Sequence, residues 1–208
     1  MKRVALVSSI GLVLIGTMYA QEGSRVSFNV GAGFTTPVGG TARRVDTGWN
    51  MQGGIGYRFI PHLGAMLQFD YNSMGINSAT LSSFNVPGGN VKLWSLTVNP
   101  VVHLNPGGHV DFYLIGGGGL YHRTQEFTAP TVDVVTAFDP FFGFYPAAVP
   151  ANQILASYSV MKPGVNGGAG FAVGTKWRAK FYAEARYHRM MFRNSHTDYI
   201  PVNFGLRW

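Results

Sequence analysis

The feature that most constrains this chain is a period-two alternation of apolar with small or polar residues. In its first copy, apolar side chains occupy every second position: Val26, Phe28, Val30, Ala32 and Phe34. Successive side chains of a β-strand point to opposite faces, so this pattern predicts a strand with one apolar and one small-polar face. Seven further segments predict strands at 49–59, 67–72, 94–103, 110–123, 162–174, 181–191 and 200–208. The alternation is least readable at 116–119, where four glycines hide the register of the fifth strand.

The links between these segments differ in length in a regular way. Short links at 60–64, 105–109 and 175–179 alternate with longer ones at 35–47, 73–90, 124–157 and 193–199. Barrels of the outer membrane have short periplasmic turns and longer external loops. The alternation therefore predicts that both chain ends face the periplasm and that the long links are external.

The composition favours a membrane rather than a soluble barrel. Charged residues make up 12% of the chain, against roughly 25% in typical globular proteins. A lipocalin-like soluble barrel would turn its apolar face inward, yet the other face here is made of Gly, Asn, Gln and charged residues, which suit a hydrated lumen. Hydrocarbon requires every backbone N–H and C=O to be paired, so the first and last strands must pair. We predict an all-β fold: a closed, antiparallel, eight-stranded transmembrane β-barrel with up-and-down topology.

The first twenty residues predict a cleaved signal peptide at 1–20, followed by one barrel domain at 21–208. Lys2 and Arg3 precede an apolar stretch that is too short to span a bilayer comfortably, and small residues lead to a cleavage site after Ala20. Removing Lys2 and Arg3 takes the formal net charge from +7 to +5. The chain has no cysteine, which excludes a lipoprotein anchor and disulfides. We expect export through the inner membrane to the bacterial outer membrane, contact with outer-membrane lipids, and no nucleic-acid partner, because the basic residues form no stripe.

The inward faces predict a polar network in the lumen. Asp70 and Arg186 lie at similar heights above the periplasmic turns, on strands that face each other in an eight-stranded barrel. We predict a plug in which Arg186 bridges Asp70, Glu184 or both, since a guanidinium can hold two carboxylates. The predicted network contains Asp70, Glu184, Arg186, His188, Gln68 and Asn99, with Asn29 and Asn203 near the same level. A metal or catalytic role for Glu184 and His188 is the weaker interpretation, because barrel interiors are filled with such networks.

The longest link, 124–157, contains an aromatic cluster between prolines: Phe138, Phe141, Phe142, Phe144 and Tyr145. Exposed apolar clusters mark contact sites, so these residues are candidates for docking on a partner surface or the membrane interface. The alternative is a lid that folds over the barrel mouth and buries its own rings. Prolines and glycines interrupt this segment too often for a membrane strand.

The whole mature chain resembles the small outer-membrane β-barrel family that includes OmpA-like, OmpX-like and opacity-type proteins. The resemblance lies in the first-strand pattern, the segments 95–100, 162–165 and 181–187, and the terminal strand. Phe204, Leu206 and the final Trp208 look like the C-terminal insertion signal that the barrel assembly machinery and periplasmic chaperones recognise.

The resemblance implies an envelope-structural, adhesive or surface-interaction protein that binds an extracellular ligand through its long loops. A narrow pore for ions or small solutes is an alternative. So is a lipid A deacylase-like enzyme, with Ser195, His196 and Asp198 at the rim. The deacylase pattern, a His two residues before a Ser, is absent, because Arg189 and Met190 follow His188. The chain is also too short for a ten-stranded barrel protease. We therefore expect no enzyme activity, cofactor or metal.

Overall fold

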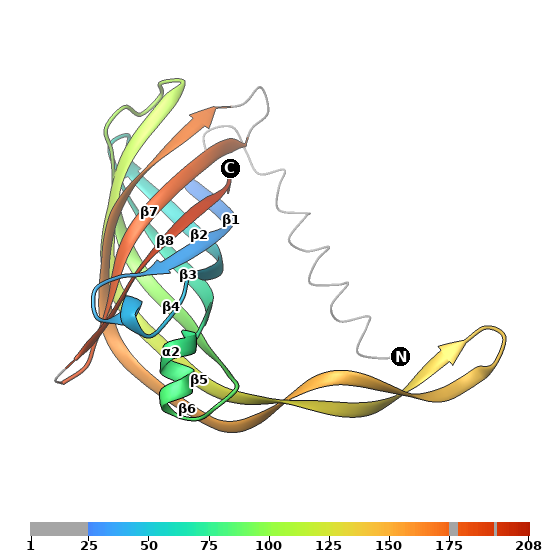
Figure 1. Ribbon diagram of the computed structural model, residues 1–208. Coiled ribbons are helices and arrows are strands. Elements are labelled where there is room, and N and C mark those ends of the chain that lie inside the picture. The colour runs from blue at the N-terminus through green and yellow to red at the C-terminus, as the bar shows by residue number, and fades with distance from the viewer. Residues whose placement is uncertain (1–24, 175–178, 194) are drawn as a thin grey trace.

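A computed structural model describes residues 25–174, 179–193 and 195–208. The strands form one closed antiparallel barrel, in which each strand pairs with the next and the last pairs with the first (Figure 1). They are β1 (Val26–Pro37), β2 (Gly48–Ile60), β3 (Leu63–Gly75), β4 (Gly88–His103), β5 (Val110–Asp139), β6 (Gly143–Gly174), β7 (Lys180–Met191) and β8 (His196–Arg207). The predicted eight-stranded barrel is confirmed. The predicted signal peptide and most of the 175–179 link lie outside the described residues.

The seam between β1 and β8 closes the barrel. Its register runs from Asn29 opposite Arg207 to Pro37 opposite Tyr199. Beyond β8, Trp208 continues the pairing: its N–H donates to the Phe28 carbonyl at 3.0 Å, and the Phe28 N–H donates to the Trp208 carbonyl at 2.8 Å. The two rings are stacked, with centroids 6.4 Å apart. The last residue therefore takes part in closure, which leaves no free edge here for a hydrocarbon environment to desolvate.

Side chains alternate between the two surfaces of the wall as the period-two pattern predicts. Along β3, Phe69 is 44% exposed on the outside, whereas the neighbouring Asp70 is 2% exposed inside. Large apolar side chains cover the outer surface on every strand, among them Val30, Phe34, Trp49, Ile55, Leu67, Leu96, Phe112, Leu114, Val165, Phe171 and Phe204. An apolar exterior around a polar interior is the arrangement of a transmembrane barrel and the reverse of a soluble one.

Two short helical segments lie in the links at the end of the barrel opposite the C-terminus (Figure 1). η2 (Thr41–Arg43) follows β1, and α2 (Ser78–Ser83) follows β3. The side chain of Asn77 caps α2 by accepting hydrogen bonds from the N–H groups of residues 79 and 80. A single bridge between Val45 and Ile76 ties the two links together. No helix in the described ranges is long and apolar enough to cross a membrane.

The prediction of a long loop at 124–157 is wrong. β5 and β6 continue through this segment as a two-stranded ribbon, paired from Thr128 opposite Ile154 to Asp139 opposite Gly143. Figure 1 shows the ribbon bending away from the barrel end and reaching well beyond the wall. β3 is also longer than the predicted 67–72.

The ribbon tolerates prolines because both of its strands are edges. Pro130, Pro146 and Pro150 stand in the ribbon, and each lies opposite a residue of the other strand. Proline removes a donor that an internal strand would need, but an edge strand points half of its N–H groups away from its partner. The turn is built by Asp139, whose carboxylate accepts from the N–H groups of Phe141 and Phe142. Gly143 supplies the positive φ of 76° that closes it.

Candidate functional site

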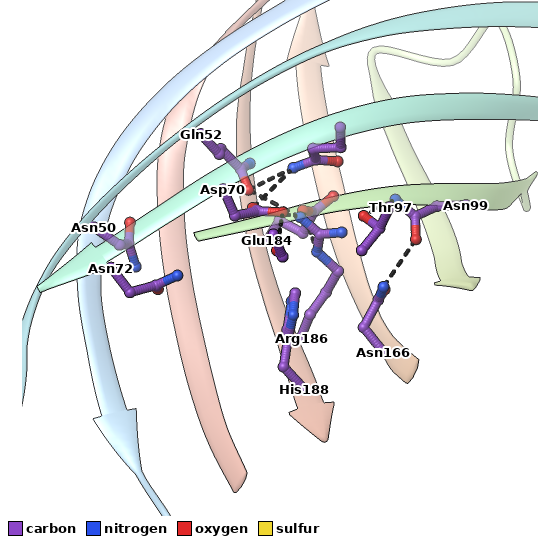
Figure 2. A network of polar contacts seen from close by, with 12 residues as sticks. Asn50, Gln52, Asp70, Asn72, Thr97, Asn99, Asn166, Glu184, Arg186 and His188 are labelled. Carbon is purple, nitrogen blue, oxygen red and sulfur yellow. Dashed lines mark hydrogen bonds and ion pairs between the residues drawn. The ribbon is translucent and has the colours of Figure 1, made fainter. Parts of the chain in front are cut away.

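Arg186 is fully buried in the lumen and contacts polar side chains from β2, β3 and β7 (Figure 2). Its Nη2 donates to Gln52 Oε1 at 2.9 Å and to Asp70 Oδ1 at 3.2 Å. Its Nε lies 2.9 Å from Glu184 Oε1, a distance that makes an ion pair, although the alignment is not that of a hydrogen bond. Arg186 thus contacts both carboxylates named in the sequence-based prediction. These three side chains come from β3 and β7, on opposite sides of the ring.

A chain of amides and a phenol extends this cluster toward the wall. Gln68 Nε2 donates to Gln52 Oε1 at 2.6 Å, and Gln52 Nε2 donates to the Tyr182 hydroxyl at 2.8 Å. Arg207 lies 4.0 Å from Glu184 Oε2, with its guanidinium 4.5 Å from the centre of the Tyr113 ring. A second positive charge therefore offsets the second carboxylate, which satisfies the requirement that buried charges be paired.

His188 and Asn99 belong to a neighbouring cluster. The Asn166 side chain donates to Asn99 Oδ1 at 2.9 Å and lies 3.4 Å from the Tyr121 hydroxyl. That hydroxyl is in turn 3.2 Å from His188 Nδ1. Asn29 and Asn203 are buried in the lumen, but no described residue hydrogen-bonds to the Asn29 side chain. The two clusters together pack the middle of the lumen with side chains.

Gly168 makes room for this packing. It pairs with Arg186 across β6 and β7. A Cβ added at Gly168 would collide with the backbone of Ala185 and with Cα and Cγ of Arg186. Glycine at position 168 is thus required by the close approach of β7.

Sequence reasoning did not assign Gln52, Tyr182, Asn166 and Arg207 to the network. All four are buried or nearly buried inward residues. They could have been identified from the rule that every second residue of a strand lies on the same face. Gln52 shares its face with Asn50, and Tyr182 shares its face with Glu184 and Arg186. A tyrosine alone does not indicate its face, because its ring suits lipid while its hydroxyl suits a polar lumen.

The rim residues considered for catalysis are not arranged as a triad. His196 Nε2 lies 3.2 Å from Asp198 Oδ2. Asp198 is held by Arg189, which donates to both carboxylate oxygens at 2.9 and 3.1 Å. Among the described residues no hydrogen bond joins the Ser195 side chain to His196, whereas nucleophilic catalysis needs that contact. Glu184 and His188 lie in the lumen, away from this rim.

In the part of the chain that the structure describes, no group of three or more His, Asp or Glu side chains could hold a metal ion.

The aromatic cluster of the ribbon lies at its tip and is open to solvent. Phe141 is 91% exposed and Phe142 is 86% exposed. The rings of Phe138 and Phe144 pack across the two strands with centroids 5.1 Å apart. Because the ribbon leads away from the barrel, the lid alternative, in which these rings are buried over the mouth, is wrong (Figure 1).

The architecture defines the chain as a small closed β-barrel, and the comparisons with known proteins agree on this fold. Residues 8–207 match the family described as "Outer membrane protein beta-barrel domain", so the chain belongs to this family. The family resides in the bacterial outer membrane.

Solved structures share this architecture at low identity. Neisserial surface protein A has a TM-score of 0.55 and 15% identity, covering 90% of this chain and 98% of its own, which supports the fold alone. Ail, the attachment invasion locus protein of Yersinia pestis, was solved in complex with the heparin analogue sucrose octasulfate; its TM-score is 0.48 at 18% identity, over 88% of this chain and 99% of its own. OprG of Pseudomonas aeruginosa has a TM-score of 0.49 at 12% identity, over 89% and 97%. No curated protein sequence matches the chain significantly.

Proposed function

We propose that this protein is a surface-interaction barrel whose extended β5–β6 ribbon is the contact element. The observation that carries the proposal is the exposed aromatic tip, Phe138 to Tyr145, presented at the end of a ribbon that leaves the barrel. A contiguous cluster of exposed large apolar side chains is uncommon on a free surface and marks a contact site.

The ribbon also has one predominantly apolar face along its length. Residues that lie directly opposite each other share a face, and the pairs on this face are Val132 with Pro150, Val134 with Ala148, Thr136 with Pro146, and Phe138 with Phe144. The acidic residues Asp133 and Asp139 lie on the other face. A two-stranded ribbon is only marginally stable alone in water, so contact with a partner surface would stabilise it.

The proposal requires that the ribbon be external and the termini periplasmic. Single cysteines at Ser83 and Thr136 should react with a membrane-impermeant maleimide on intact cells, and a cysteine at Gly107 should stay unlabelled until the cells are opened. Labelling of the Gly107 position alone would reverse the orientation and remove the ribbon from the cell surface.

The contact role is tested by excising the ribbon. Residues 129–153 are replaced by Asn-Gly, which favours a tight hairpin between Thr128 and Ile154. Cells displaying the shortened barrel should lose adherence to matrix-coated wells and cell monolayers, whereas the full chain confers it. A second variant, with Phe141, Phe142 and Phe144 changed to Ser, keeps the ribbon and isolates the tip. Adherence equal to that of the full chain in both variants would refute the proposal.

We further propose that the lumen is closed at Arg186. The support is the packing of the Arg186 and His188 clusters across the lumen, which favours a closed barrel over the narrow pore. Hydrolysis at the rim is not part of the proposal, because Ser195 and His196 do not form a nucleophile–base pair.

A further inference from the structure

The half of the lumen nearest the two helical links differs from the polar network around Arg186. A cavity of about 1090 Å³ lies between the two helical links and the start of β8. Its floor is apolar, formed by Met74, Leu93 and Val91, each nearly or fully buried. On β3 the inward residues change from Asp70 and Asn72 to Met74 on approaching this end. The cavity is therefore separate from the Arg186 network.

The lining of this cavity carries positive charge alone. Arg44, Arg123 and Arg193 line it, and no Asp or Glu appears among the described residues that form it. His196, which also lines it, is paired with Asp198. An unbalanced set of guanidinium groups over an apolar floor is complementary to an anion that carries an apolar part.

Arg123 is the most constrained of the three arginines. Its Nη1 donates to Thr197 Oγ1 at 3.0 Å, and its guanidinium lies 4.9 Å from the centre of the Phe192 ring. Its Nε is buried without a hydrogen-bond partner among the described residues, and it forms no ion pair with them. A partly buried charge that is oriented but unpaired is costly unless an anion meets it.

A second, smaller cavity adjoins the first. It has a volume of about 440 Å³ and shares Phe84 and Gln125 with the larger one. Apart from Gln125 and the Tyr158 hydroxyl, its lining side chains are apolar, including Phe84, Phe127 and Leu155. It lies at the base of the ribbon, where the Phe84 and Phe127 ring centroids are 5.9 Å apart.

We propose that the two cavities together bind a soluble amphiphile with one anionic head group, of the class of a fatty acid. The carboxylate is held by Arg123 with Arg44 at the rim, and the hydrocarbon chain enters the apolar cavity beside Phe84 and Phe127. Because the Arg186 network fills the lumen below, the site captures the ligand at the cell surface and does not conduct it inward. This site is independent of the aromatic tip of the ribbon.

The test is calorimetric titration of dodecanoate into the full chain in nanodiscs of zwitterionic lipid, with empty nanodiscs subtracted. Arg123→Gln and Arg44→Gln are the test variants. Arg43→Gln is the matched control, because Arg43 is an exposed neighbour that does not line the cavity. Losing the charge-assisted contact of Arg123 should weaken binding about tenfold, which corresponds to about 1.4 kcal/mol. Arg43→Gln should leave the affinity unchanged.

Dodecanol supplies the uncharged counterpart and should bind about tenfold more weakly than dodecanoate, for the same reason. Arg44 stands in an exposed link, so Arg44→Gln keeps the test valid if Arg123→Gln fails to fold. The proposal is overturned if dodecanoate binds no better than it does to empty nanodiscs, or if dodecanol binds as tightly as dodecanoate. It is equally overturned if Arg43→Gln weakens binding as much as the two test variants do.

Discussion

β5 and β6 pass through two environments, and the contrast between them explains how the molecule is built. Within the barrel, between Tyr113 and Tyr121, β5 is paired on both edges, with β4 on one side and β6 on the other. Its outer side chains face lipid and its inner ones fill the lumen. Beyond Thr128, β5 keeps its pairing with β6 and loses β4. The same alternating pattern then forms a ribbon with two open edges and two exposed faces.

The alternating pattern is the same in both segments of β5. What distinguishes the barrel wall from the ribbon is that strands in the wall belong to a closed sheet and are paired on both edges. A closed sheet satisfies every backbone group and fixes what each face meets. A two-stranded ribbon has only its cross-strand pairs. Changes inside the wall should therefore affect folding strongly, and changes in the ribbon should affect it little.

The largest effect is expected at the seam. Trp208→Asp removes the terminal aromatic that the assembly machinery is expected to recognise, and it places a charge against Phe28 where β1 and the chain end pair. The protein should be degraded in the periplasm, with loss of the heat-modifiable band from the membrane fraction. Trp208→Phe keeps an aromatic ring and should assemble. Normal assembly of Trp208→Asp would show that the last residue is dispensable.

The next effect is expected at the centre of the lumen. Arg186→Ala leaves Asp70 and Glu184 buried without their guanidinium partner, which costs about 3–5 kcal/mol for a broken buried pair. The thermal midpoint of heat-modifiability should fall well below that of the parent barrel. Arg189→Ala, on the same strand, breaks an ion pair whose arginine is 43% exposed and should shift the midpoint far less. Equal shifts in the two variants would mean that the lumen network does not stabilise the wall.

Adjacent glycines of β6 provide a smaller and more local test. Gly168→Ala forces a Cβ into the backbone of Ala185 and the side chain of Arg186, and overpacking of this kind costs about 1–3 kcal/mol. Gly167→Ala meets no atom within 4 Å and should be close to neutral. Denaturation in urea compares the two variants directly. If Gly167→Ala were the more damaging change, the inward and outward assignment of β6 would be wrong.

The smallest effect is expected at the rim that carries Ser195 and His196, beyond the apolar belt of β8 that begins at Ile200. Burial alone would raise the pKa of Asp198, but hydrogen bonds from Arg189 and Tyr187 and the charges of Arg189 and His196 lower it below its ordinary value of 3.8. A carboxyl group with a lowered pKa stabilises the folded state above pH 4 and loses that contribution as acid protonates it. The thermal midpoint should therefore fall as the pH is lowered from about 4 through the lowered pKa of Asp198, and Asp198→Asn should reduce that fall. An unchanged slope in the variant would show that the pair contributes nothing.

The strands of the barrel wall and much of the lumen can be predicted from the sequence. The alternation assigns each side chain to one face, and the need for a closed sheet determines which strands pair. Arg186 and Asp70 could be placed at one height from their distance to the periplasmic turns, and they are in contact at 3.2 Å. The ribbon could not be predicted, because Pro130, Pro146 and Pro150 exclude an internal strand while remaining compatible with an edge. The alternation alone does not distinguish a loop from a pair of strands that continues beyond the barrel wall.

The apolar half of the lumen, at the end that carries the helical links, also could not be predicted from the sequence. Met74 and Leu93 lie outside the predicted strands 67–72 and 94–103, so the alternation assigned them to neither face, and both are buried in the lumen. The change from a polar to an apolar interior depends on the links that cover this end, where Val45 and Ile76 pair. Contacts between links far apart in the sequence leave no periodic signal.

Hydrogen exchange along β5 tests most directly whether closure separates the wall from the ribbon. With the full chain in nanodiscs, amides of the wall segment 112–120 should exchange only through opening of the whole barrel. Amides of the ribbon segment 130–138 should exchange orders of magnitude faster, because a two-stranded ribbon opens locally. Equal protection of the two segments would contradict the account, since the ribbon would then belong to the same cooperative unit as the wall.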